Sequence, residues 1–330
     1  MKALVVHAGA AALREVPSPE PVPGEALVRP LRMALGPGEL PSAGGARSGT
    51  VIGREFVGVV ERVEPAPGRT VGASLVGKRV VGSAHASCGV CDRCRSGLSA
   101  HCRSRVTLGD ARPGCCAELL TIAAANLLEV PPSVSDDEAV LAPAVAAAVH
   151  IAGTVPGNTR PFISVLGDTA EGLLVALLLW RRKETVRMLT AAPVASAVCE
   201  KWGLRHRPLN EAGRRQDQDL VIETAGSAAS LITALEFVRP RGRVLVTRAC
   251  EEPAGVTPAR DITAAVLRQE VELCGVRGED FPGAIHLLKS ASVQLAPLIT
   301  RRGTFEQGPD LLNALNPADH LRVVLAAPAR

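Results

Sequence analysis

The sequence predicts a two-domain α/β protein in which a β-rich domain precedes a doubly wound parallel sheet. Three observations support this prediction. The chain has 330 residues, and at roughly 100–200 residues per domain this length suggests about two domains. Short apolar runs divided by Gly and Pro fill the first 150 residues, which is typical of β structure with many turns. Beyond Val155, apolar strands alternate with helical segments, which indicates βαβ units.

The first domain is expected over residues 1–155. Its apolar runs, such as 56–60 and 79–81, have the length of single strands. The second domain is expected over residues 156–295, and residues 296–330 are expected to return to the first domain. In the second domain we predict strands at 162–166, 186–189, 220–223 and 243–247, and helices at 173–180, 194–202 and 230–238.

Composition excludes several classes of protein. Net charge is only +4, aromatic content is 2% and the basic residues form no long run, so nucleic-acid binding is not expected. No stretch of 18 apolar residues occurs and the N-terminus does not read as a secretory signal, so no membrane association is expected. We therefore expect a cytoplasmic protein.

Four of the nine cysteines lie close together, at Cys88, Cys91, Cys94 and Cys102. Two gaps of two residues and one of seven let four thiolates converge on one tetrahedral centre. Zinc suits four sulfurs, and a complete shell leaves no position for a substrate. The sequence therefore predicts one structural zinc ion per chain, in a lobe at about residues 85–105. Four free buried cysteines are the alternative.

A glycine-containing turn follows the expected strand at 162–166. The dinucleotide-binding fingerprint places glycines at the first, third and sixth positions. Gly167 and Gly172 fit the first and the last, whereas Thr169 stands in the middle position, where a side chain obstructs the approach of a pyrophosphate. Glu171 adds a negative charge where a helix N-terminus attracts phosphate.

The second expected strand ends at Thr190 without the acidic residue that holds ribose hydroxyls, and no arginine follows to favour a 2′-phosphate. Binding of NAD(P) is therefore an open question from the sequence. The alternative is a doubly wound sheet that keeps the fold without the nucleotide.

The cysteine cluster and the βαβ half together resemble the zinc-type alcohol dehydrogenase branch of the medium-chain dehydrogenase/reductase superfamily. The segments 53–60, 77–81, 114–118 and 223–226 are similar to family motifs. The resemblance implies a GroES-like catalytic domain, an inserted Rossmann domain and NAD(P)-dependent oxidoreductase chemistry. It also implies that Thr224 approaches the nicotinamide and that the chain forms a dimer or a tetramer.

The family's catalytic zinc ligands are absent where the motifs align. Gly36 stands for the cysteine ligand, Arg54 for the histidine and Pro143 for the third ligand, and Gly38 replaces a relay hydroxyl. Arginine has no lone pair to offer a metal. The sequence therefore predicts a degenerate catalytic zinc site. His150 is the remaining candidate for a substitute ligand, with an ordinary histidine as the alternative.

Arg54 and Glu55 are the candidate catalytic residues of the vacated site. Arg54 either polarises a substrate carbonyl, pairs with Glu55, or fills the cavity inertly. Two main functions follow: a zinc-independent NAD(P)H-dependent reductase of a carbonyl or activated alkene, or a pseudoenzyme that serves as a binding or scaffold protein. A redox sensor based on Cys115 and Cys116 is a third. The substrate cannot be identified from the sequence.

Overall fold

The computed structural model describes residues 1–7, 9–36, 49–66, 73–157, 160–249, 259–315 and 319–328. The chain forms two compact units, one of residues 1–143 with 281–330 and the other of residues 144–280. These bounds differ from the predicted segments 1–155, 156–295 and 296–330. Most of helix α3 (Ala142–Gly153) belongs to the second unit, and α8 (Phe281–Lys289) belongs to the first. The change in composition near Val155 follows α3 and therefore places the boundary too late.

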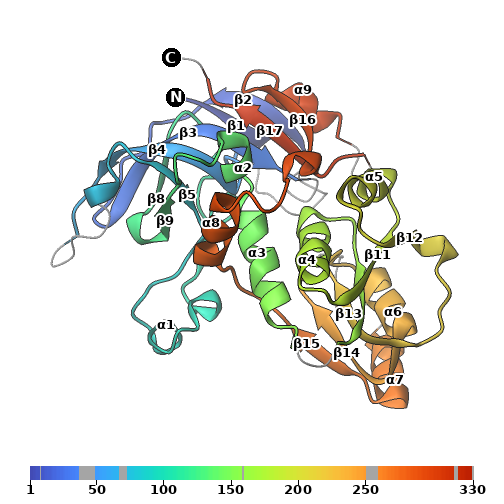
Figure 1. Cartoon of the computed structure of the whole chain (residues 1–330). Coiled ribbons are helices and arrows are strands. Elements are labelled where there is room, and N and C mark those ends of the chain that lie inside the picture. The colour runs from blue at the N-terminus through green and yellow to red at the C-terminus, as the bar shows by residue number, and fades with distance from the viewer. Residues whose placement is uncertain are drawn as a thin grey trace. The chain divides into compact units, whose positions relative to one another are not determined.

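The first unit is built on a seven-stranded sheet (Figure 1). Along it the strands run β16-β17-β3-β4-β5-β9, and β8 also pairs with β3. β17 lies between β16, its parallel partner, and β3, its antiparallel partner. The bounds of the seven strands are β3 (Glu25–Leu35), β4 (Glu55–Val63), β5 (Arg79–Gly82), β8 (Leu120–Ala123), β9 (Leu127–Glu129), β16 (Ile299–Thr304) and β17 (Arg322–Ala326).

Smaller elements complete this unit. β1 (Lys2–His7) and β2 (Ala10–Glu15) form an antiparallel hairpin, and β6 (His85–Ala86) pairs with β7 (Val106–Thr107). Its further helices are α1 (Asp92–Arg95), α2 (Asp136–Ala139), α9 (Gly308–Asn313) and the 3-10 turns η2 (Ala73–Leu75), η3 (Ser99–His101), η4 (Ala124–Asn126) and η6 (Ala296–Leu298).

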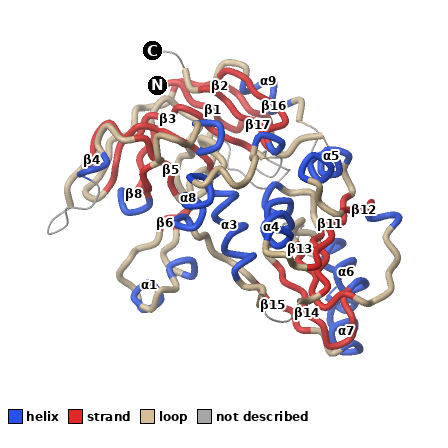
Figure 2. Tube along the Cα trace, in the orientation of Figure 1, coloured by secondary structure: helices blue, strands red, loops and turns tan. Residues whose placement is uncertain are grey.

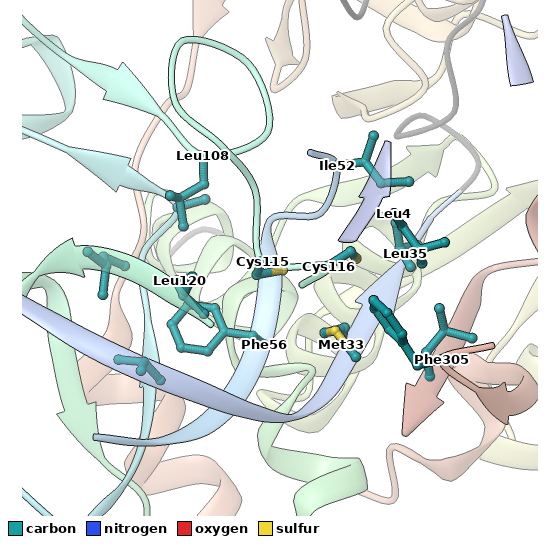
Figure 3. Close-up of a cluster of buried hydrophobic side chains, with 14 of the residues drawn as sticks. Leu4, Met33, Leu35, Ile52, Phe56, Leu108, Cys115, Cys116, Leu120 and Phe305 are labelled. Atoms are coloured by element: carbon teal, nitrogen blue, oxygen red, sulfur yellow. The ribbon is translucent and has the colours of Figure 1, made fainter. Parts of the chain in front are cut away.

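One large apolar cluster forms most of the core of the first unit, and a smaller one lies around Ala3, Val5, Val51 and Ala117. Figure 3 shows Phe56 and Met33 beside the sulfur atoms of Cys115 and Cys116. Phe305, from the C-terminal part of the chain, belongs to the same cluster and is fully buried. Residues from both ends of the sequence therefore share one core.

The second unit is a six-stranded parallel sheet in the order β12-β11-β10-β13-β14-β15, with helices between consecutive strands (Figure 2). This is the predicted doubly wound arrangement. β10 has the predicted bounds, and the other predicted elements differ by a few residues at their ends. The bounds are β10 (Phe162–Leu166), α4 (Ala170–Arg181), β11 (Thr185–Thr190), α5 (Pro193–Trp202), β12 (His206–Pro208), η5 (Leu209–Glu211), β13 (Gln218–Glu223), α6 (Ala228–Phe237), β14 (Val238–Val246), α7 (Ala259–Gln269) and β15 (Glu272–Gly275).

Helix α4 is buried along most of its length. This agrees with the expectation that the apolar stretch before Arg181 is a core helix. Among the residues that the structure describes, no helix is long and apolar enough to span a membrane.

Candidate functional site

The four clustered cysteines converge in the lobe that contains α1 and η3. All four Sγ atoms lie within 4.8 Å of one another. The separation is 3.5 Å between Cys91 and Cys94, 3.6 Å between Cys88 and Cys102, and 4.0 Å between Cys88 and Cys94. Zn–S bonds of about 2.3 Å in a tetrahedron place sulfurs about 3.8 Å apart. The lobe therefore has the dimensions of a four-thiolate zinc centre.

Protonation of these thiols is strongly perturbed by their proximity. The backbone N–H of Cys94 lowers the pKa of the Cys91 thiol to about 6, with the neighbouring thiols contributing further. Desolvation and the Cys91 sulfur raise the pKa of Cys94 to about 11. Proximity thus favours thiolate at one sulfur and opposes it at another. A divalent cation is the partner that lets all four be thiolates at once.

Gly167 begins the turn between β10 and α4. Its φ is +121°, a value that glycine adopts readily and other residues rarely do. A Cβ at Gly167 would approach the backbone N of Ala225 to 2.6 Å, and one at Gly172 would collide with the Thr224 hydroxyl. Both fingerprint glycines are thus required by the close approach of the turn that follows β13. The strand, turn and helix of a dinucleotide-binding unit are present.

Thr169, in the middle fingerprint position, is the N-cap of α4. Its Oγ1 accepts a hydrogen bond from the Gly172 N–H at 2.9 Å and lies 3.2 Å from the Thr224 hydroxyl. The hydroxyl is held against the start of the helix and satisfies one of its free N–H groups. The turn therefore keeps the glycine positions and the helix start of a dinucleotide-binding unit. The negative charge of Glu171, in the first turn of α4, opposes the binding of a pyrophosphate there.

The two predicted threonine contacts are both buried. The Thr190 hydroxyl lies 2.8 Å from that of Ser196, on α5. The Thr224 hydroxyl donates to the Leu166 carbonyl at 3.1 Å. Each hydroxyl is therefore engaged within the second unit, and the interpretation of Thr190 and Thr224 as cofactor contacts stays a prediction.

Asp168 is a residue that the sequence analysis did not single out. Its Oδ2 accepts the N–H groups of Ala191 and Ala192, at 2.8 and 2.6 Å, at the end of β11. Its Oδ1 is shielded from solvent and has no hydrogen-bond partner within the described part of the chain. Desolvation raises the pKa of the carboxyl, against the opposing effect of the two N–H groups. Asp168 fills a position that the fingerprint leaves unspecified, which is why the motif gave no signal.

Glu55, at the start of β4, forms a bidentate ion pair with Arg322, at the start of β17. Both Nε–Oε2 and Nη2–Oε1 distances are 2.9 Å, and each residue is 7% exposed. The suggested pairing of Glu55 with Arg54 is therefore wrong. Both carboxylate oxygens accept hydrogen bonds from Arg322, so we assign Glu55 to this pair, and its role as a catalytic candidate stays a prediction. The sequence could have indicated that Glu55 has a cationic partner, because a glutamate at the start of a buried strand requires one. It could not have identified that partner as Arg322.

Two further candidates lie in ordinary surroundings. The His150 ring on α3 packs against Gly278, where a Cβ would come within 2.6 Å of Nε2. Cys115 and Cys116 are fully buried in the core shown in Figure 3 and neither forms a disulfide; the Cys115 thiol donates to the Glu55 carbonyl at 3.4 Å. Neither placement favours the ligand role of His150 or the redox-sensor function. Gly38 lies outside the described residues.

Comparison with known proteins identifies the family. Residues 22–132 match the alcohol dehydrogenase GroES-like domain. The chain is 25% identical over 295 residues to L-threonine 3-dehydrogenase from Cronobacter sakazakii, which covers 84% of this chain and 82% of the relative. The chain belongs to the medium-chain dehydrogenase/reductase superfamily, in its zinc-type alcohol dehydrogenase branch.

Solved structures agree with this assignment. The alcohol dehydrogenase from Thermus sp. ATN1 is 25% identical, with a TM-score of 0.81 over 99% of this chain and all of that one. A short-chain alcohol dehydrogenase from Escherichia coli CFT073, complexed with NADH, has a TM-score of 0.82 at 23% identity over 99% of each chain. The second likeness shows the fold alone.

In this medium-chain dehydrogenase, a cation lies beside the position of the first family zinc ligand. A Cβ added to Gly36 would lie 2.9 Å from Nη1 of Arg322. Arg54, at the position of the histidine ligand, is half-buried. Pro143, at the third position, is a buried residue in the first turn of α3. None of the three side chains can donate a lone pair to a metal.

Proposed function

We propose that this medium-chain dehydrogenase is an NAD(P)-dependent oxidoreductase that holds one structural zinc and works without a catalytic zinc. The observation that carries the proposal is the turn from Gly167 to Gly172. It keeps the backbone shape of a dinucleotide site, with the Thr169 hydroxyl bonded to the start of the helix. A bound nicotinamide would supply or accept the hydride.

The structural zinc is assigned to Cys88, Cys91, Cys94 and Cys102 on the separation of their sulfur atoms. A filled shell of four thiolates has no open position, so this ion binds no substrate. Its function is to hold a lobe whose two helical elements, α1 and η3, are short and contain no buried residue.

The reaction we propose is reduction of a carbonyl or of an activated alkene. A catalytic zinc acts on alcohols by lowering the pKa of the bound hydroxyl, and the residues at positions 36, 54 and 143 cannot hold one. Arg54 offers a fixed positive charge and several N–H donors to a substrate oxygen. Its guanidinium has no hydrogen bond or ion pair with the residues that the structure describes, so it is available for this role.

Titration of the zinc-loaded protein with NADH and with NADPH tests the proposal. Quenching or enhancement of the nicotinamide fluorescence should saturate at micromolar cofactor, and a Thr169→Gly variant should bind at least as well. Glycine costs only a few tenths of a kcal/mol as an N-cap, so the variant should remain folded. Absence of binding by either protein at millimolar cofactor would overturn the proposal.

A scaffold or binding protein is the second candidate function. Two carboxylates, Asp168 and Glu171, flank the helix N-terminus that would receive the pyrophosphate, and this observation favours it. The same titration separates the two functions, because a scaffold would bind neither cofactor and would turn over none of a panel of aldehydes, ketones and enones.

We also propose that the chain forms a dimer or a tetramer through β15. This strand is at the edge of the parallel sheet, all four of its residues are exposed and Leu273 is 41% exposed. An exposed edge with an apolar side chain is suited to pairing with a second copy.

A further inference from the structure

Asp168 places a negative charge at the end of β11, although the sequence supplies none there. In dinucleotide-binding folds this end of the second strand faces the adenosine ribose, and an acid on the strand itself distinguishes a 2′-hydroxyl from a 2′-phosphate. Here the strand ends in Thr190, whose hydroxyl is taken by Ser196. The carboxylate comes instead from the turn after β10.

The Asp168 carboxylate occupies the donors that an anion would use. The backbone N–H groups of Ala191 and Ala192 precede α5, whose N-cap, Ala192, has no side chain able to cap it. Both N–H groups donate to Oδ2 of Asp168. Backbone N–H groups at a helix N-terminus are a ready site for phosphate. In this chain that site is already filled by a carboxylate.

The sequence after β11 supplies no cation to offset the Asp168 carboxylate. No Lys or Arg occurs between Thr190 and Glu200, so no cation follows β11 to hold a 2′-phosphate. Cys199, on α5, has its pKa raised to about 12 by burial and then by the Asp168 charge. The hydrogen bonds to Ala191 and Ala192 place the carboxylate at the start of α5, in agreement with this electrostatic effect.

We propose that Asp168 is the specificity-determining residue that makes this chain select NAD(H) over NADP(H). The inference rests on the proposed dinucleotide-dependent function. A 2′-phosphate carries about −1.5 to −2 charges near neutral pH, by analogy with other phosphate monoesters. It would meet a carboxylate in the place of its N–H donors, and like charges brought together weaken binding. The unesterified ribose of NAD(H) carries no such charge.

The experiment compares the dissociation constants of NADH and NADPH by fluorescence titration in the wild type, Asp168→Asn and Glu171→Gln. Wild type should bind NADH about tenfold or more tightly than NADPH, since one such charge contact amounts to about one decade of affinity. Asp168→Asn keeps the shape and removes the charge, so it should tighten NADPH about tenfold and change NADH by less than about threefold. Thermal unfolding confirms that the variants are folded, and Asp168→Ser replaces Asp168→Asn if the latter is not.

Glu171→Gln is the matched control. Glu171 lies in the first turn of α4, close to Asp168 in sequence, whereas the N–H groups of Ala191 and Ala192 donate to Asp168. Its removal should change NADH and NADPH affinity equally, because both cofactors share the pyrophosphate. Equal binding of the two cofactors by wild type, or an unchanged ratio in Asp168→Asn, overturns the inference alone. Binding of neither cofactor overturns the proposed function and the inference with it.

Discussion

Glu55 and Arg322 are 267 positions apart in the sequence and form a buried bidentate pair. Removing one partner of such a pair leaves an uncompensated charge in the interior, which costs more than the pair contributes when intact. The pair joins the first residue of β4 to the first residue of β17, so its loss should be felt across the large sheet.

We therefore expect Glu55→Gln to lower the free energy of unfolding by about 3–5 kcal/mol. Urea unfolding followed by circular dichroism measures the change. Glu20→Gln is the control, because its partner Arg62 is 51% exposed and Glu20 itself is 80% exposed. Removal of an exposed pair should cost less than about 1 kcal/mol. Equal effects of the two changes would contradict the importance of the buried pair.

A second residue-scale prediction concerns the pH dependence of Asp168. Desolvation raises its pKa in the folded protein above the ordinary value of 3.8. The folded state therefore holds this proton to higher pH than the unfolded state does, and the carboxyl contributes stability that is lost as pH rises. Asp168→Asn has no such titration. The stability of the wild type relative to the variant should be greater at pH 4 than at pH 7, as measured by urea unfolding. The opposite trend would show that the two N–H donors outweigh desolvation.

At the scale of elements, helices and strands were predicted best where an apolar run is bounded by residues typical of turns. β10, α4 and β11 follow the apolar pattern, because their buried residues lie in runs that only the core can accommodate. The cysteine spacing also predicted which sulfurs converge. Arg322 and Asp168 escaped prediction for a physical reason. Their partners, Glu55 and the N–H groups after β11, are brought near by topology and leave no local pattern.

The zinc lobe gives the element-scale prediction. Cys91→Ser should abolish binding of the one zinc ion that we propose for this lobe, and it should make residues 88–105 sensitive to trypsin at the exposed Arg93, Arg95 and Arg103. Metal analysis by mass spectrometry and timed proteolysis measure both effects. Cys274→Ser, on exposed β15, should keep one zinc and the wild-type cleavage pattern. Two zinc ions per wild-type chain would refute the vacated catalytic site.

At the scale of the whole molecule, the chain is two compact units, and the predicted boundaries were displaced at both ends. The two displacements arise at α3 and α8. The composition of these two helices does not show whether each belongs to the first or to the second unit. Assembly is the property at this scale that we propose to depend on one exposed strand, β15.

We predict that Leu273→Lys converts the proposed oligomer into monomers. A charge on an exposed edge strand opposes pairing with another strand. Light scattering after size-exclusion chromatography measures the mass of wild type and variant. Lys289→Glu, on α8 of the first unit, is a charge-changing control that should leave the mass unaltered. A monomeric wild type would overturn the proposal for β15.

The position of β17 between β16 and β3 has a consequence for how the protein is made. Ribosomes synthesise the chain from its N-terminus. β3 and β4 are therefore made long before β17, the strand that pairs with β3. The parallel sheet is continuous in sequence and can fold while translation proceeds. The β-rich unit closes only when β17 is available, and until then the edge of β3 and the Glu55 carboxylate lack the partners that β17 supplies.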